Sequence, residues 1–103
     1  MTAGDLPQAA LDETIHSPYR LRICSLLRQL GPTDYVLLRE SLQVSPSVLS
    51  KHLKKLEEVG YVALSTRITN TRPHGWATLT EQGQEVFSSH LSYLEQLINE
   101  NRA

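Results

Sequence analysis

SPSVLSKHLKKLEEVGYV, residues 45–62, combines a helix start, an amphipathic run and a helix stop. Ser45 is a good N-cap, and Pro46 suits the first helical position because its fixed φ fits a helix and its missing N–H has no partner to lose there. Gly60 is the natural C-cap. These signals predict a helix that ends at about Val59.

This predicted helix has two different faces. At about 100° per residue, Leu49, Leu53 and Leu56 point in one direction, where they anchor the helix to the core. The opposite direction carries hydroxyl, ammonium and carboxylate groups: Ser47, Ser50, Lys51, Lys54 and Glu58. Such a face suits either solvent or a polyanion, and the segments on both sides favour the second interpretation.

A second helix precedes this one. Thr33 is expected to open it, with Leu38 and Leu42 facing inward, and Gln43-Val44 is a short connection. Two helices joined by so short a turn form a helix-turn-helix, here over residues 33–59.

A hairpin is predicted after Gly60, over residues 61–79. The first strand is rich in β-branched and aromatic residues. Residues 70–75 contain proline and glycine among polar residues and are expected to form the turn. Residues 76–79 are expected to form the return strand. A hairpin in this place is a wing beside the helix-turn-helix.

The remaining segments are predicted to be helical. Apolar residues at helical spacing predict an N-terminal helix over residues 6–15. Ser17-Pro18 caps a second helix, which Gly31-Pro32 ends. Thr80 caps a last helix that forms the C-terminal element over residues 80–99. The predicted fold is α+β but mostly α: a single winged helix-turn-helix domain over residues 1–103, with terminal helices left to form a dimer interface.

Composition excludes several classes of protein. No apolar run approaches the roughly 20 residues that a membrane span needs, and residues 1–10 lack the basic start and apolar core of a secretory signal. A single cysteine, Cys24, agrees with a reducing compartment. We therefore expect a cytoplasmic protein with no membrane partner.

Charge is unevenly distributed along the chain. The net charge is −1, but residues 1–16 carry −3, residues 17–76 carry +5 and residues 77–103 carry −3. A basic middle between acidic ends is typical of a DNA-facing module, although scattered surface charge would give the same numbers.

Candidate DNA contacts lie on the helix after Ser45 and on the wing. Serine hydroxyls suit base edges, the helix N-terminus suits a phosphate, and lysines supply salt-dependent phosphate contacts. A wing arginine can enter the minor groove. For His52, a phosphate contact and a packed structural role remain equally open. The candidates are Ser45, Pro46, Ser47, Ser50, Lys51, His52, Lys54, Lys55, Arg67, Asn70 and Arg72.

The terminal helices are more apolar than one core requires. The last helix carries two adjacent apolar stripes, of which one can cover the protein's own core and the other needs a partner. The candidate dimer contacts are Leu6, Leu11, Phe87, Leu91, Leu94, Leu97 and Ile98. A two-fold dimer would bury them, and a monomer with self-packed terminal helices is the alternative.

Several stretches together resemble a known family. LDETIHSPYRLRI (residues 11–23), VLSKHLKKLEEVGYV (48–62), Arg72-Pro73, Trp76 and LTEQG (79–83) resemble small bacterial and archaeal winged-helix regulators related to the MarR and ArsR groups. The resemblance implies a homodimer that binds duplex DNA through the helix after Ser45 and the wing, as a transcription regulator and by analogy a repressor. Gln43 departs from the pattern, because this turn commonly has glycine, and a positive φ there would strain glutamine.

Other functions have little support in the sequence. There is no Cys-x-Cys or Cys-x-x-Cys, so a thiolate metal site is not expected, and no cofactor is predicted. Cys24 is expected to be a buried structural thiol, and His90 could pair across a dimer. The sequence contains no recognisable catalytic motif. Ser50 and His52 would point about 160° apart on a helix, which is wrong for a nucleophile and its base. A small-molecule effector between the terminal helices and the DNA-binding part stays open, as does the alternative of a winged helix that binds protein instead of DNA.

Overall fold

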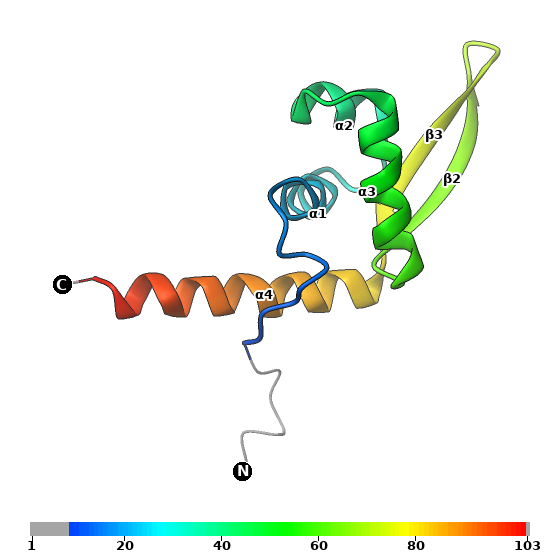
Figure 1. The fold of residues 1–103 in the computed structure, drawn as a ribbon. Helices are drawn as coiled ribbons and strands as arrows, with labels where there is room; N and C mark the ends of the chain where they lie inside the picture. The colour runs from blue at the N-terminus through cyan, green and yellow to red at the C-terminus, as the bar shows by residue number, and fades with distance from the viewer. Residues whose placement is uncertain (1–8, 103) are drawn as a thin grey trace.

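The computed structural model describes residues 9–102 and shows a winged helix (Figure 1). The described residues form four helices and a three-stranded antiparallel sheet, so the mostly helical α+β prediction is confirmed. The elements are α1 (Pro18–Leu30), β1 (Thr33–Asp34), α2 (Tyr35–Leu42), α3 (Pro46–Glu58), β2 (Val62–Thr69), β3 (Arg72–Leu79) and α4 (Glu81–Glu100). None of the helices in this part of the chain is long and apolar enough to cross a membrane.

The helices begin where the sequence places caps. Ser17 Oγ accepts a hydrogen bond from the Arg20 N–H over 3.5 Å, Ser45 Oγ accepts one from the Val48 N–H over 3.2 Å, and Thr80 Oγ1 accepts one from the Gly83 N–H over 3.0 Å. Each bond satisfies an amide that has no partner inside the helix. The predicted starts of α1, α3 and α4 are therefore confirmed.

The core lies where α1, α2 and α3 meet the sheet. One apolar stripe from each helix is buried, and each such side chain contributes roughly 1.5–3 kcal/mol relative to an exposed one. The buried core residues on the three helices are Ile23, Cys24, Leu27, Leu38, Leu42, Leu49, Leu53 and Leu56. This core fixes how α3 stands against α1 and the wing.

A short strand replaces the expected start of α2. The sequence predicts that Thr33 opens a helix, but Thr33 and Asp34 pair with Ala77 and Trp76 of β3. The Asp34 carboxylate instead caps α2 by accepting the Val36 N–H over 2.7 Å. A two-residue strand has no periodicity to detect, and its partner lies far along the chain, so local pattern could not find it.

The return strand of the wing is longer, and the turn tighter, than the sequence predicts. β2 and β3 pair from Val62↔Leu79 to Thr69↔Arg72, so the turn is Asn70-Thr71 and not residues 70–75. Both turn residues have a positive φ, as a type I′ hairpin turn requires. Pro73 fits a strand here because β1 reaches only the base of β3, which leaves the far side of the strand unpaired.

The described part of the expected N-terminal helix, residues 9–15, is not helical. Residues 9–16 contain no helix, and residues 6–8, with Leu6, lie outside the described residues. Asp12 Oδ1 accepts the Ile15 N–H over 2.9 Å, a local turn bond that competes with helix formation. Leu11, a candidate dimer contact, is exposed.

α4 begins in the core and leaves it. Figure 1 shows its C-terminal half extending past the other elements. The sequence predicts Phe87 at a dimer interface, but this residue is only 2% exposed and belongs to the protein's own core. Further along α4, the apolar residues Leu91, Leu97 and Ile98 are exposed. The core therefore covers only the N-terminal part of the apolar surface of α4.

Candidate nucleic-acid interface

α3 exposes a polar face, and the wing hairpin stands next to this helix. The hairpin rises beside α3, and its tip projects beyond the helices (Figure 1). Leu49, Leu53 and Leu56 of α3 are buried. The opposite face is exposed along its whole length: Ser45, Pro46, Ser47, Ser50, Lys51, Lys54 and Lys55. Arg67, Asn70 and Arg72 are also exposed, on the wing.

The turn before α3 is built on a left-handed residue. Gln43 has a positive φ in the left-handed helical region, the conformation in which a glycine would carry no strain. Its N–H donates to the Glu40 carbonyl over 3.3 Å, and the Val44 N–H donates to the Arg39 carbonyl over 3.2 Å. These bonds close the end of α2 and direct the chain into α3. Gln43 thus adopts the positive φ that glycine commonly provides in this turn.

Two side-chain contacts brace the wing. The Arg67 guanidinium lies over the Trp76 ring, 4.4 Å from its centroid, which is a cation–π contact. His74 Nδ1 lies 3.2 Å from Asp34 Oδ2, which ties β3 to the residue that caps α2. Arg67 is thus held against the sheet, while Asn70 and Arg72 stand at the tip.

His52 contacts α1 through Arg20, a residue that the sequence analysis does not place at the candidate interface. Arg20 Nη1 donates to His52 Nδ1 over 3.1 Å, and the Tyr19 and His52 rings lie 5.5 Å apart. Burial, then the charges of Arg20 and Lys51, lower the His52 pKa, which favours the neutral form of the ring. Arg20 could not be assigned from sequence, because no local pattern places the first turn of α1 beside α3.

Cys24 and His90 are both interior. Burial chiefly, and then the Asp12 charge, raise the pKa of the fully buried Cys24 thiol to about 12, as expected of a structural thiol. The sequence leaves His90 open to a contact across a dimer. It is instead fully buried and accepts the Asp12 N–H within the same chain. Among residues 9–102, no group of three or more metal-binding side chains is suitably placed for an ion.

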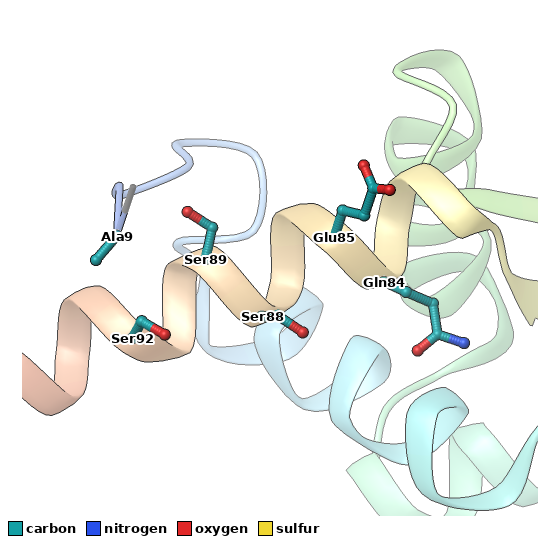
Figure 2. A pocket seen from close by; sticks show the side chains of 6 residues that line it. All are labelled: Ala9, Gln84, Glu85, Ser88, Ser89 and Ser92. Atoms are coloured by element: carbon teal, nitrogen blue, oxygen red, sulfur yellow. The ribbon is translucent and has the colours of Figure 1, made fainter. Parts of the chain in front are cut away.

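Three hollows lie along α4, away from α3 and the wing, and two of them also involve other segments. Figure 2 shows the first, which is lined by Ala9 and by Gln84, Glu85, Ser88, Ser89 and Ser92 of α4. The second separates α1 from α4 and is more apolar, with Leu21, Phe87 and Leu91 in its wall. Arg28 borders it, with its guanidinium 5.6 Å from the Phe87 ring centroid and a 2.8 Å hydrogen bond to Ser88 Oγ.

Comparisons with known proteins agree with this geometry. The family model described as a winged helix DNA-binding domain matches residues 19–98. The uncharacterized protein MJ0432 of Methanocaldococcus jannaschii is 30% identical over 82 residues, which cover 80% of this chain and 89% of that protein. A transcriptional regulator homologue of Pyrococcus horikoshii OT3 has a similar structure, with a TM-score of 0.83 and 25% identity over 89% of this chain and 91% of that one.

A third neighbour has been solved with DNA. ZitR of Lactococcus lactis, as a cysteine-to-serine mutant in complex with DNA, matches with a TM-score of 0.61 and 29% identity over 82% of this chain and 56% of that chain. A second structure of ZitR describes it as a zinc-responsive MarR family member.

Fold, exposed polar face and comparisons together define a class, that of MarR-like winged-helix transcription regulators. The chain belongs to the winged helix DNA-binding domain family. Its resemblance to winged-helix regulators, first noted on the sequence motifs, is thereby confirmed.

Proposed function

We propose that this protein reads a specific duplex DNA sequence as a homodimer and represses transcription from the site it occupies. The observation that carries the proposal is the exposed face of α3, where serines lie toward the N-terminal end and lysines follow, next to a projecting hairpin. A helix of this composition fits the major groove, and the hairpin reaches the adjacent minor groove.

Each part of the surface has a distinct role in this proposal. Ser47 and Ser50 meet base edges, and the N-terminus of α3 at Ser45 and Pro46 meets a phosphate. Lys51, Lys54 and Lys55 contact phosphates and give affinity that falls with salt. Arg72 and Asn70 at the wing tip enter the minor groove, while Arg67, held over Trp76, stays at the groove edge.

The dimer is carried by the free half of α4. Leu91 and Leu97 are each 40% exposed and Ile98 is 54% exposed, on a segment that leaves the body of the protein. Pairing these residues and Leu94 with the same stripe of a second copy buries them, and Leu11 lies on the segment that crosses α4. Such a pair presents two α3 helices to major grooves about 10 base pairs apart.

Repression needs no further domain, because a dimer on a promoter blocks access to it. A small-molecule effector of unidentified chemistry has a place to bind in the apolar hollow between α1 and α4. A ligand there would act on the angle between α4 and the DNA-binding helices. A melting-temperature screen against small amphipathic compounds tests this, since a ligand that binds the folded state raises the melting temperature.

The rival function is a winged helix that binds protein. It requires an apolar or acidic face on α3, whereas this face carries serines and lysines. Combining Lys51→Glu with Lys54→Glu distinguishes the two functions in a duplex-binding assay. DNA binding should be abolished while the oligomeric state stays unchanged.

A matched control uses Arg22→Glu with Arg102→Glu, the same change in charge at exposed positions outside α3 and the wing. This control should keep most of its affinity. Equal loss in both variants would mean that only net charge matters, and that α3 is not the reading surface.

A further inference from the structure

A basic hollow lies on the flank of α3, and part of it comes from a different helix. Its wall is formed by Arg20 of α1 and five residues of α3. All but one of the six carry a basic side chain. The residues of this hollow, called here the flank pocket, are Arg20, Lys51, His52, Lys54, Lys55 and Glu58.

Arg20 is held in place by two hydrogen bonds. Its Nε donates to the Thr14 carbonyl over 2.5 Å, and its Nη1 donates to His52 Nδ1 over 3.1 Å. A guanidinium fixed in this way has less side-chain freedom to lose when it binds an anion, and its planar fork matches two oxygens of a phosphate. The fold thus positions this arginine in advance.

The positive charge of the flank pocket is not neutralised internally. Within residues 9–102, neither Arg20 nor the three lysines form an ion pair with a carboxylate, and Glu58 lines the hollow without pairing. Because Nδ1 of His52 accepts from Arg20, the neutral ring carries its proton on Nε2, which is a donor. The lowered pKa of His52 agrees with this excess of positive charge, because burial and then the charges of Arg20 and Lys51 disfavour a protonated ring.

We propose that the flank pocket binds one phosphate of the DNA backbone beside the groove that α3 enters, with Arg20 as its principal ligand. This rests on the proposed function and extends the DNA contact from α3 and the wing to α1. A backbone phosphate adds affinity and fixes the position of the helix without adding sequence preference. Inorganic phosphate has the same oxygen chemistry, so the test separates the two sources.

The test compares Arg20→Gln with Arg22→Gln on a duplex that the protein binds. Both changes remove one positive charge from α1, but Arg22 is exposed and lies outside the flank pocket. Arg20→Gln should weaken binding by about tenfold and reduce the slope of log affinity against log salt by about one. Base preference should be unchanged. Arg22→Gln should alter neither quantity, and equal behaviour of the two variants would overturn the proposal.

A second measurement locates the phosphate and guards against a misfolded variant. Single methylphosphonate substitutions along the duplex remove one phosphate charge at a time. One position in each half-site should weaken the wild-type protein but leave Arg20→Gln unaffected, because the contact is already lost. Lys55→Gln, which leaves the Thr14 and His52 bonds of Arg20 intact, should show a partial effect at the same position. Absence of any such position overturns the proposal.

The last arm uses inorganic phosphate alone, followed by the NMR signals of His52. Shifts in the wild-type protein that are absent in Arg20→Gln, combined with no coupled position on the duplex, would mean that the pocket takes a free phosphate and that its assignment to DNA is wrong. If the wild-type protein binds no duplex at all, the proposed DNA-binding function itself is wrong. If the wild-type protein binds duplex DNA and Arg20→Gln binds it equally well, only the role of Arg20 is wrong.

Discussion

The backbone N–H of Asp12 donates a hydrogen bond to Nδ1 of His90 over 3.0 Å, joining the N-terminal segment to α4. The carboxylate of Asp12 accepts the Tyr61 O–H over 2.7 Å at the start of the wing. One residue thus connects three parts of the fold. His90 is fully buried, and the His16 ring lies 5.4 Å away.

This contact predicts a loss of stability in acid. Nδ1 accepts a hydrogen bond only when it carries no proton, and burial and His16 lower the His90 pKa, while Asp12 partly opposes them. The folded pKa then lies below the unfolded value of about 6.5. The contribution is fully present above that unfolded value and is lost as the pH falls from it through the folded pKa.

Urea unfolding between pH 7.5 and pH 5 measures this effect. His90→Asn keeps an acceptor near the Nδ1 position but does not titrate, so it should lose less free energy of unfolding on acidification than the wild type. Its absolute stability should be lower at every pH because the smaller side chain leaves a cavity. Parallel pH curves for the two proteins would contradict the assignment to His90.

Gly83 is predicted to resist a substitution that normally stabilises helices. It lies in the first turn of α4, and an added Cβ would collide with the Tyr61 carbonyl oxygen and crowd the Leu79 side chain. Gly83→Ala should therefore lower the free energy of unfolding by about 1–3 kcal/mol, despite the better helix propensity of alanine. Chemical denaturation measures this, and a gain in stability would show that α4 does not pack so closely on the wing.

The wing turn is predicted to improve with glycine. Thr71 has a positive φ, an unfavourable conformation for a β-branched residue, and a type I′ turn favours glycine there. Thr71→Gly should stabilise the protein by about 0.5–1 kcal/mol, the relief of left-handed strain less the added entropy of the unfolded chain. Thr69→Gly, within β2, should do the opposite. A lower melting temperature for Thr71→Gly would argue against the two-residue turn.

Sequence reasoning succeeded where structure is decided locally. The caps at Ser17, Ser45 and Thr80 are read from neighbouring residues, and the leucine spacing of α3 fixes its buried face. It failed where distant pairing decides. β1 exists because residues 33–34 pair with β3, and the wing turn lies at residues 70–71 because Thr69 pairs with Arg72, a register in which Pro73 can lie within a strand.

The candidate interface shows the same division. The exposure of the α3 face and of the wing residues could be predicted from their spacing, but the position of Arg20 could not, because its place beside His52 depends on how α1 crosses α3. The prediction that Phe87 lies at a dimer interface is wrong for a related reason. An apolar stripe shows that part of a helix is covered, and only the packing shows that Phe87 meets the protein's own core while Leu97 does not.

Dimer formation is predicted to depend on the exposed end of α4. Leu97→Glu with Ile98→Glu places charges in the apolar contact and should give monomers in analytical ultracentrifugation, with a large loss of affinity for a two-half-site duplex. Gln82→Glu with Gln96→Glu adds the same charge to exposed α4 positions and should remain dimeric. If both double variants had the mass of a dimer in solution, the dimer interface would have to lie outside the exposed end of α4.

Selection of bound duplexes from a random pool, repeated across a salt series, shows whether this protein reads DNA sequence as a dimer. We expect an enriched inverted repeat with half-site centres about 10 base pairs apart and affinity that falls steeply as salt rises. Absence of any enriched sequence, together with binding that ignores salt, would contradict it and favour a winged helix that binds protein.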